Sequence, residues 1–249
     1  MVGILSDVGK VRKLNEDSLN FYIGSDFSIY VIADGMGGHN AGEVASKIAV
    51  DTTICYMKSA DINSKDMEDH LLCAIDMANR KIFQLSKQNE KLSGMGTTIT
   101  VCLVKEDKMV TANVGDSGCY ILKKNGITKI TKDHSLVQQL LDEGSITEEE
   151  AAIHPNKNII TRALGTNLSV EADIFKIDLR DVYKVLMCTD GLSNEVELNE
   201  MYDIIMGNNN NNDACRQLIE LSKLKGGRDN ISVIVFEGEC KDDRDYAGK

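Results

Sequence analysis

The sequence predicts an α+β fold, a layered sandwich in which β-sheets pack face to face and helices lie outside them. Two patterns alternate along the chain: short runs of apolar, β-like residues and longer segments with a helical period. Very short connections join many of the short runs, and residues 105–108 and 124–126 are typical of hairpin turns. Strands joined in this way pair antiparallel, so we expect antiparallel sheets.

Strands are expected where short apolar runs lie between turn residues. These runs are Ser18–Ile23, Ser28–Ala33, 97–104, 109–114, 119–123, 127–131, 170–176, Lys184–Cys188 and 231–236. Helices are expected where apolar residues recur at i, i+3, i+4 and i+7 and form one buried stripe. They are residues 41–52, residues 66–89 and a pair near the C-terminus, residues 198–206 and 213–223.

Residues 135–165 differ from the rest of the chain and indicate an insertion between strands, a mobile flap. This region holds two short helical pieces, 136–143 and 147–153, and then the only proline, Pro155. The asparagine run 208–212 is expected to be a loop without a function, because asparagine is a poor helix former. We expect one domain over residues 1–238 and a charged C-terminal tail over residues 239–249.

The net charge of −11 argues against a nucleic-acid-binding surface and against docking on anionic lipid. It fits an enzyme that gathers carboxylates around cations, although solubility alone explains most of the excess. The chain has seven cysteines, an odd number, and none of them form a Cys-x-x-Cys pair. This pattern indicates buried reduced thiols and not a disulfide framework or a zinc site. No apolar run reaches the roughly 20 residues of a membrane span, and residues 1–20 do not resemble a signal peptide. We therefore expect a cytoplasmic protein with no membrane partner.

Aspartates stand at the ends of the apolar runs. Three runs end at Asp34, Asp116 and Asp190, and two others begin just after Asp17 and Asp229. In an antiparallel sheet the end of one strand lies beside the start of its neighbour, so all of these carboxylates can meet on one rim. They would repel one another and resist ionisation, and Mg²⁺ or Mn²⁺ would relieve this. Each aspartate alone has an ordinary explanation as a turn or cap residue, and only the joint pattern favours a metal site.

The motifs around these aspartates resemble those of the metal-dependent protein phosphatases of type 2C, the PPM family, and most closely its compact bacterial members. The resemblance covers nearly the whole chain, with the motifs in the order of the family. The motifs are GKVRKLNED (9–17), VIADGMGGH (31–39), GMGTT (94–98), ANVGDS (112–117), TDGL (189–192) and GRDNIS (227–232).

The resemblance implies a four-layer α-β-β-α sandwich, with two antiparallel sheets flanked by helix pairs and the metals at one end. It implies that Asp34 bridges two Mn²⁺ or Mg²⁺ ions. Asp190 and Asp229 would complete the protein ligands of the first ion, and the carbonyl of Gly35 would bind the second. Such a pair of ions can activate a water for in-line attack on a phosphate ester.

Further roles follow from the same resemblance. Asp17 and Glu16 would hold metal-bound waters, and Asp116 would serve a third, weaker metal known from bacterial relatives. Relatives usually carry arginine after Gly-Asp-Ser, whereas this chain has Gly118. This departure puts the support of the Asp116 loop in question, but it does not affect the first two metals.

The resemblance also implies how the phosphate is bound and protonated. Arg12 matches the phosphate-binding arginine of the family and offers a bidentate fork. His39 either donates a proton to the leaving oxygen or only holds its loop by a hydrogen bond. Animal-type relatives have a histidine at the place of Met36, so a metal-bound water is the other candidate for the acid. His134 is interpreted as structural.

The implied function is hydrolysis of phosphoserine and phosphothreonine in proteins, opposing a bacterial serine/threonine kinase, by a chain expected to be a monomer. Three alternatives stay open on the sequence: an inactive binding module, a hydrolase for small phosphorylated molecules, and a calcium-binding protein. The retained Asp34, Asp190 and Asp229 argue against the first, and the absence of an Asp-x-Asp-x-Asp-Gly loop argues against the third. A phosphopeptide compared with a nucleotide separates the second.

Overall fold

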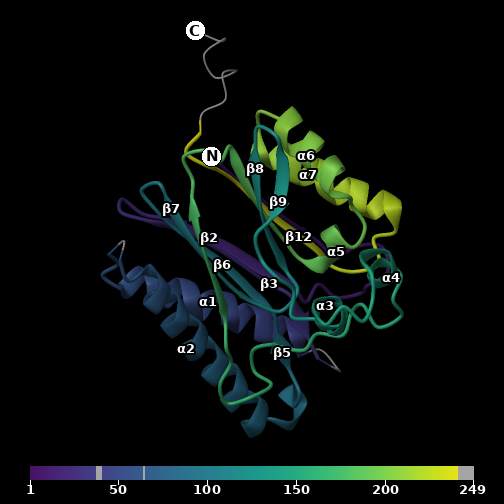
Figure 1. Ribbon diagram of the computed structural model, residues 1–249. Helices are drawn as coiled ribbons and strands as arrows, with labels where there is room; N and C mark the ends of the chain where they lie inside the picture. Colours follow the sequence, from purple (N-terminus) through teal and green to yellow (C-terminus); the bar gives the residue numbers. More distant parts are fainter. Residues whose placement is uncertain (38–40, 64, 241–249) are drawn as a thin grey trace.

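The computed structural model shows two five-stranded antiparallel sheets that pack face to face, with helices on both outer sides (Figure 1). It describes residues 1–37, 41–63 and 65–240. The first sheet has the order β1 (Val2–Asp7), β12 (Ile231–Glu237), β11 (Lys184–Cys188), β8 (Gly118–Lys123), β9 (Gly126–Lys129). The second has the order β10 (Asp173–Asp178), β7 (Lys108–Val114), β6 (Ile99–Lys105), β3 (Ser28–Ala33), β2 (Ser18–Ile23).

Helices cover each sheet in a pair (Figure 1). The second sheet is covered by α1 (Gly42–Ser59) and α2 (Met67–Gln88), and the first by α6 (Leu198–Gly207) and α7 (Asn211–Lys225). The remaining short elements are β4 (Gly35–Met36), β5 (Gly96–Thr97), the 3₁₀ helix η1 (Glu90–Leu92), α3 (Leu136–Asp142), α4 (Glu148–Ala152) and α5 (Asp190–Ser193). Among the described helices, none has the length and apolar character needed to cross a membrane.

Three apolar layers hold the sandwich together. One lies between α1, α2 and the second sheet, one between α6, α7 and the first sheet, and one between the two sheets. In the middle layer the rings of Tyr30 and Phe236 stack with centroids 3.8 Å apart, which joins β3 to β12 across the sheets. Ala45 and Ala49 are fully buried on α1 and leave room for close packing on the sheet. The predicted four-layer α-β-β-α architecture is confirmed.

The hydrophobic periodicity located most elements correctly. β2, β3 and β11 have the predicted bounds, and the two predicted hairpins pair Lys105 with Lys108 and Lys123 with Gly126. The predicted strand 97–104 is wrong in one respect, since the chain forms β5 and β6 with a break at Thr98. Thr98 exchanges two hydrogen bonds with the backbone of Asp34, and this turns β5 away to pair with β4.

The asparagine run is not a loop throughout, so that prediction is wrong. Helix α7 begins at Asn211, and the side chain of Asn210 caps it by accepting a hydrogen bond from the Asn212 N–H. Asn211 is only 1% exposed and donates from Nδ2 to the Met1 carbonyl and to Glu237 Oε1. Asparagine is a poor residue inside a helix but a good one at its start, and the prediction missed this difference.

The N-terminal strand β1 was not predicted, and β10 begins three residues later than the predicted strand 170–176. The cysteines are free, but Cys55 and Cys73 are exposed, so burial does not account for all of them. In the predicted tail, the backbone N–H groups of Glu239 and Cys240 donate to Leu179 and Val182. Residues 241–249 lie outside the described residues.

Candidate metal centre

The strand pairing brings the predicted aspartates together at one end of the sandwich, near α5 and the α3–α4 segment (Figure 1). Ser18 pairs with Ala33, so Asp17 and Asp34 are neighbours on the second sheet. On the first sheet β11 pairs with β12, which places Asp190 after the end of β11 beside Asp229. The two pairs therefore come from different sheets and face each other across the middle layer.

A threonine joins the two sheets at this point. Thr189 Oγ1 donates to Asp17 Oδ2 over 2.9 Å and accepts from the Ser232 N–H over 3.0 Å. Thr189 is fully buried. Asp17 is thereby held by a residue of the opposite sheet that directly precedes Asp190 in the chain.

The carboxylates repel one another strongly. Burial first, and then the charges of the neighbouring aspartates, raise the pKa of Asp34 well above its ordinary value. The same two causes raise the pKa of Asp116 to about 8, that of Asp17 to about 7 and that of Asp190 to about 6. Buried carboxyl groups that lie this close together need a compensating positive charge in order to ionise, and bound cations would supply that charge.

The donor set fits Mn²⁺ or Mg²⁺, which prefer carboxylate and carbonyl oxygens. Asp17 Oδ1 and Asp116 Oδ1 are buried and have no hydrogen-bond partner among the described residues, so both are available as ligand atoms. Two other oxygens are engaged: Asn194 donates to Asp190 Oδ2 over 3.0 Å, and Arg12 donates to Asp229 Oδ2 over 2.8 Å.

Within the described part of the chain, no three His, Cys, Asp or Glu side chains are already arranged to hold an ion. The described side chains therefore do not form a ready-made three-ligand site. The carboxyl and carbonyl groups of the cluster supply enough oxygen atoms to bind an ion. The ions would replace the protons that the raised pKa values favour.

Gly35 lies where no side chain fits. A Cβ atom at this position would clash with the backbone of Glu16 and of Gly42. The Gly35 N–H donates to the Glu16 carbonyl over 3.1 Å. Burial and the charge of Glu43 raise the pKa of Glu16, which lies beside the cluster. Both residues lie beside the acidic group, and their roles at a metal stay predictions.

Arg12 lies at the rim of the cluster. Its side chain is 49% exposed and forms an ion pair with Asp229. His39 lies outside the described residues, together with Gly38 and Asn40, so its predicted role stays a prediction.

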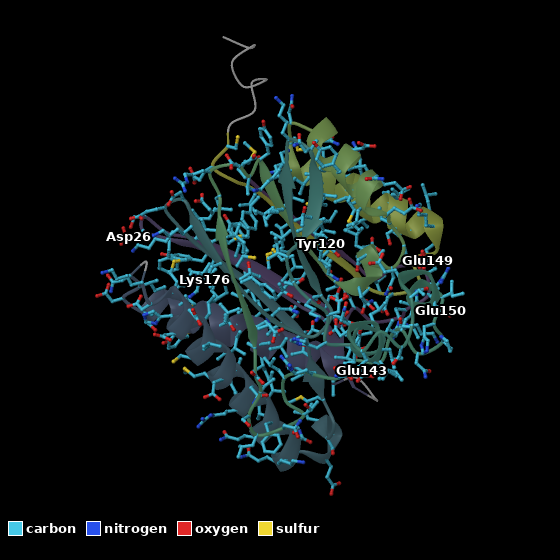
Figure 2. The ribbon with its side chains drawn as sticks, in the orientation of Figure 1. Asp26, Tyr120, Glu143, Glu149, Glu150 and Lys176 are labelled. Atoms are coloured by element: carbon cyan, nitrogen blue, oxygen red, sulfur yellow. The ribbon has the colours of Figure 1, made fainter. Side chains whose placement is uncertain are left out.

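The Asp116 loop is well supported without the usual arginine. A Cβ atom at Gly118 would approach Tyr120 Cε2 to 2.5 Å, so the tyrosine ring fills the space next to this glycine. Figure 2 shows Tyr120 inside the body of the molecule. Hydrogen bonds hold the loop instead: Ser117 Oγ bonds to Thr98 Oγ1, and Asn113 Nδ2 donates to the Gly115 carbonyl. The loop therefore has its own hydrogen bonds in a chain with Gly118, and the effect of this glycine on a third metal stays a prediction.

Sequence reasoning missed Asn230, which organises the loop that carries Arg12. Asn230 is 5% exposed, and its Nδ2 donates to the carbonyls of Val8 and Leu14 while its Oδ1 accepts from the Glu16 N–H. The partners lie more than 200 residues away in the chain. The signal that could have found it is its place directly after Asp229, within the GRDNIS motif.

A double sheet sandwich that gathers buried aspartates at one end defines a class of protein, the metal-dependent phosphatases. The sequence profile described as Protein phosphatase 2C matches residues 10–219. The serine/threonine phosphatase Stp of Listeria welshimeri is 38% identical over 235 residues, which cover 93% of each chain.

Solved structures agree with this. The serine/threonine phosphatase Stp1 from Staphylococcus aureus has a TM-score of 0.91 at 34% identity, covering 97% of this chain and 95% of that one. The catalytic domain of the phosphatase PstP in complex with two manganese ions has a TM-score of 0.83 at 34% identity, covering 96% and 97%. This chain belongs to the protein phosphatase 2C family.

Proposed function

We propose that this chain hydrolyses phosphoserine and phosphothreonine in proteins at a binuclear Mn²⁺ or Mg²⁺ centre formed by the aspartate cluster. The observation that carries the proposal is the group of buried carboxylates from both sheets whose pKa values are raised by burial and mutual repulsion. The relatives named as serine/threonine phosphatases and the manganese complex of PstP support the substrate class and the metal.

Asp34 would bridge the two ions, with Asp190 and Asp229 on one and the Gly35 carbonyl on the other. When bound, the ions supply a water of lowered pKa and neutralise the phosphate oxygens. Asp17, held by Thr189, would orient metal-bound water through its unpartnered Oδ1. Glu16 would act at the outer edge of the same group, and Asp116 would serve a third ion.

Arg12 would bind the phosphate. Its guanidinium lies beside Asp229, so a phosphate that approaches the cluster meets a positive charge at its rim. Arg12 Nη2 now donates to Asp229 Oδ2, and it would be free to donate to the phosphate when Asp229 serves as a metal ligand. Proton donation to the leaving oxygen is assigned either to His39 or to a metal-bound water, as the sequence analysis left it.

The substrates would be phosphorylated proteins, with a serine/threonine kinase as the opposing enzyme and a monomer as the active form. Residues 135–165, which carry α3 and α4 beside the centre, would contact the protein substrate as a flap. Figure 2 shows Glu143, Glu149 and Glu150 on the outer side of this segment. The single domain would span residues 1–238, followed by a tail.

The test is phosphate release from a phosphothreonine peptide with Mn²⁺, with Mg²⁺ and with EDTA. Wild type is compared with Asp190→Asn and with a control, Asp76→Asn, which alters an exposed aspartate paired with Arg80 on α2. We expect metal-dependent turnover in wild type and control, and none in Asp190→Asn. Full activity in EDTA would refute the metal mechanism. Turnover of a nucleotide in preference to the peptide would refute the substrate class.

A further inference from the structure

A buried histidine holds the backbone just before Asp116. The ring of His134 is 7% exposed, and its Nδ1 accepts a hydrogen bond from the Gly115 N–H over 3.0 Å. In return the His134 N–H donates to the Gly115 carbonyl over 2.9 Å. Gly115 has φ +109, a conformation open mainly to glycine. Both backbone groups of Gly115 therefore bond to one residue 19 positions further along the chain, and for the N–H it is the partner that the structure gives, whereas the carbonyl also accepts from Asn113 Nδ2.

The other ring nitrogen faces the second sheet and the predicted flap. His134 Nε2 lies 3.2 Å from Asp173 Oδ2 on β10 and 3.0 Å from Arg162 Nη1. Arg162 Nη1 also donates to Asp173 Oδ1 over 2.7 Å and to the Glu171 carbonyl over 3.0 Å. One aspartate thus accepts from both the histidine and the arginine.

The contacts with Gly115 and Asp173 decide the form of the ring, because Arg162 Nη1 donates its two N–H groups to Asp173 Oδ1 and the Glu171 carbonyl and has none left for His134 Nε2. Nδ1 must carry a lone pair, because its partner is a backbone N–H, which can only donate. The ring proton then sits on Nε2 and is donated to Asp173. A charged imidazolium would place an N–H at Nδ1 against the N–H of Gly115, and that hydrogen bond would be lost.

We propose that His134 is a positioning residue for Asp116: its neutral Nε2–H tautomer, oriented by Asp173, holds the Gly115 N–H and so sets the Asp116 carboxylate for a cation. Through Arg162 the same contacts link residues 135–165 to the centre. This inference rests on the proposed metal role of Asp116. The free buried Oδ1 of Asp116 is the atom that the turn would aim.

The surroundings favour the required neutral form. Burial is the main cause that lowers the pKa of His134, and the charge of Arg162 acts in the same direction. The carboxylates of Asp173 and Asp133, which face the ring from β10 and from the preceding residue, oppose this without reversing it. Partners that orient a metal-binding group from behind typically change metal affinity by roughly 10–100-fold when they are lost.

The first test reads the ring directly in the metal-free protein. In ¹⁵N-labelled full-length protein at neutral pH, the chemical shifts of the His134 ring nitrogens should report an unprotonated Nδ1 and a protonated Nε2. A coupling across the hydrogen bond between the Gly115 nitrogen and Nδ1 should also be measurable. A proton on Nδ1 would overturn the proposal. This readout does not depend on activity, so it decides the tautomer even if the proposed function fails.

The second test uses two replacements that each retain one half of the ring's contacts. In His134→Asn the amide oxygen stands near the place of Nδ1 and can still accept from Gly115, whereas in His134→Gln the amide reaches the place of Nε2 and leaves Gly115 unpaired. Mn²⁺ binding is followed by calorimetry and by the Mn²⁺ dependence of phosphopeptide hydrolysis. We expect His134→Asn to stay close to wild type and His134→Gln to need roughly tenfold more Mn²⁺ for the weak site.

Equal behaviour of the two variants, or a larger loss in His134→Asn, would overturn the proposal. If wild type itself hydrolyses nothing, the proposed function fails, while the Mn²⁺ titrations and the ring tautomer still decide the role of His134. If His134→Gln does not fold, the tautomer and the Mn²⁺ affinity of His134→Asn remain as the deciding measurements. In that case a wild-type affinity supports the acceptor role and a tenfold loss refutes it.

Discussion

Replacing Asn230 by alanine should loosen the loop that carries Arg12 and destabilise the protein by a predictable amount. The change removes two donated hydrogen bonds, to Val8 and Leu14, and one accepted from the Glu16 N–H. At about 1 kcal/mol each the three bonds amount to about 3 kcal/mol. Water can reach the carbonyls near the surface and replace part of this, so we expect a loss of about 2 kcal/mol.

Urea unfolding in EDTA measures this loss without any contribution from bound metal. The slope of the unfolding free energy against urea should stay unchanged, because the mutation alters stability and not the size of the folded core. Asn20→Ala is the matched control, since Asn20 is exposed and its side chain accepts only from the neighbouring Phe21 N–H. The control should change stability by less than about 0.5 kcal/mol.

An equally small effect of Asn230→Ala would refute the reasoning. It would mean that the Arg12–Asp229 ion pair and the Gly35 to Glu16 hydrogen bond already fix the loop. If instead the expected loss is found, the KM for a phosphopeptide should rise as well. The loop then holds Arg12 less firmly, and phosphate binding weakens before the chemical step does.

In EDTA the protein should become more stable as the pH falls from about 8 toward about 4. Burial raises the pKa of Asp116 to about 8 and that of Asp17 to about 7. Over this pH range the folded state therefore binds protons that the unfolded state does not bind. Urea unfolding at several pH values in this range measures the stability, and a stability that rose with pH would contradict the prediction. Arg12→Ala should raise KM with little change in kcat, and an unchanged kcat/KM would show that Arg12 is only a surface charge. Gly118→Arg should cost about 1–3 kcal/mol by overpacking against Tyr120, and an unchanged melting temperature would show that the ring moves aside.

The sequence predicted the layers of this fold more accurately than the first and last residues of its elements. Strand β11 is buried along its whole length and β3 in all but its first residue, and their continuous apolar runs made the bounds plain. The break at Thr98 could not be predicted, because it depends on hydrogen bonds to Asp34, 64 residues away. The start of α7 could not be predicted from helix propensity, because the burial of Asn211 depends on Met1 and Glu237.

The candidate site likewise contains residues that could be predicted from the sequence and residues that could not. The aspartates could be named from the sequence because each stands at the end of a strand, and antiparallel pairing brings strand ends together. The residues that hold them could not be named, since Thr189 and Asn230 act on partners 172 and more than 200 positions distant. A threonine or an asparagine carries no signal of its own until the partner is known.

The origin of the aspartates in two different sheets links the stability of the fold to its chemistry. Asp17 and Asp34 flank strands of the second sheet, and Asp190 and Asp229 flank strands of the first, so their repulsion acts between the two sheets. Without cations that repulsion opposes the packing of the two sheets, and the Tyr30–Phe236 stack and its neighbours must outweigh it. A cation that binds only the folded state would turn the same contact into an attraction, because Asp34 of the second sheet would share the first ion with Asp190 and Asp229 of the first sheet. With the proposed centre between the sheets, metal binding and sheet packing would be parts of one equilibrium.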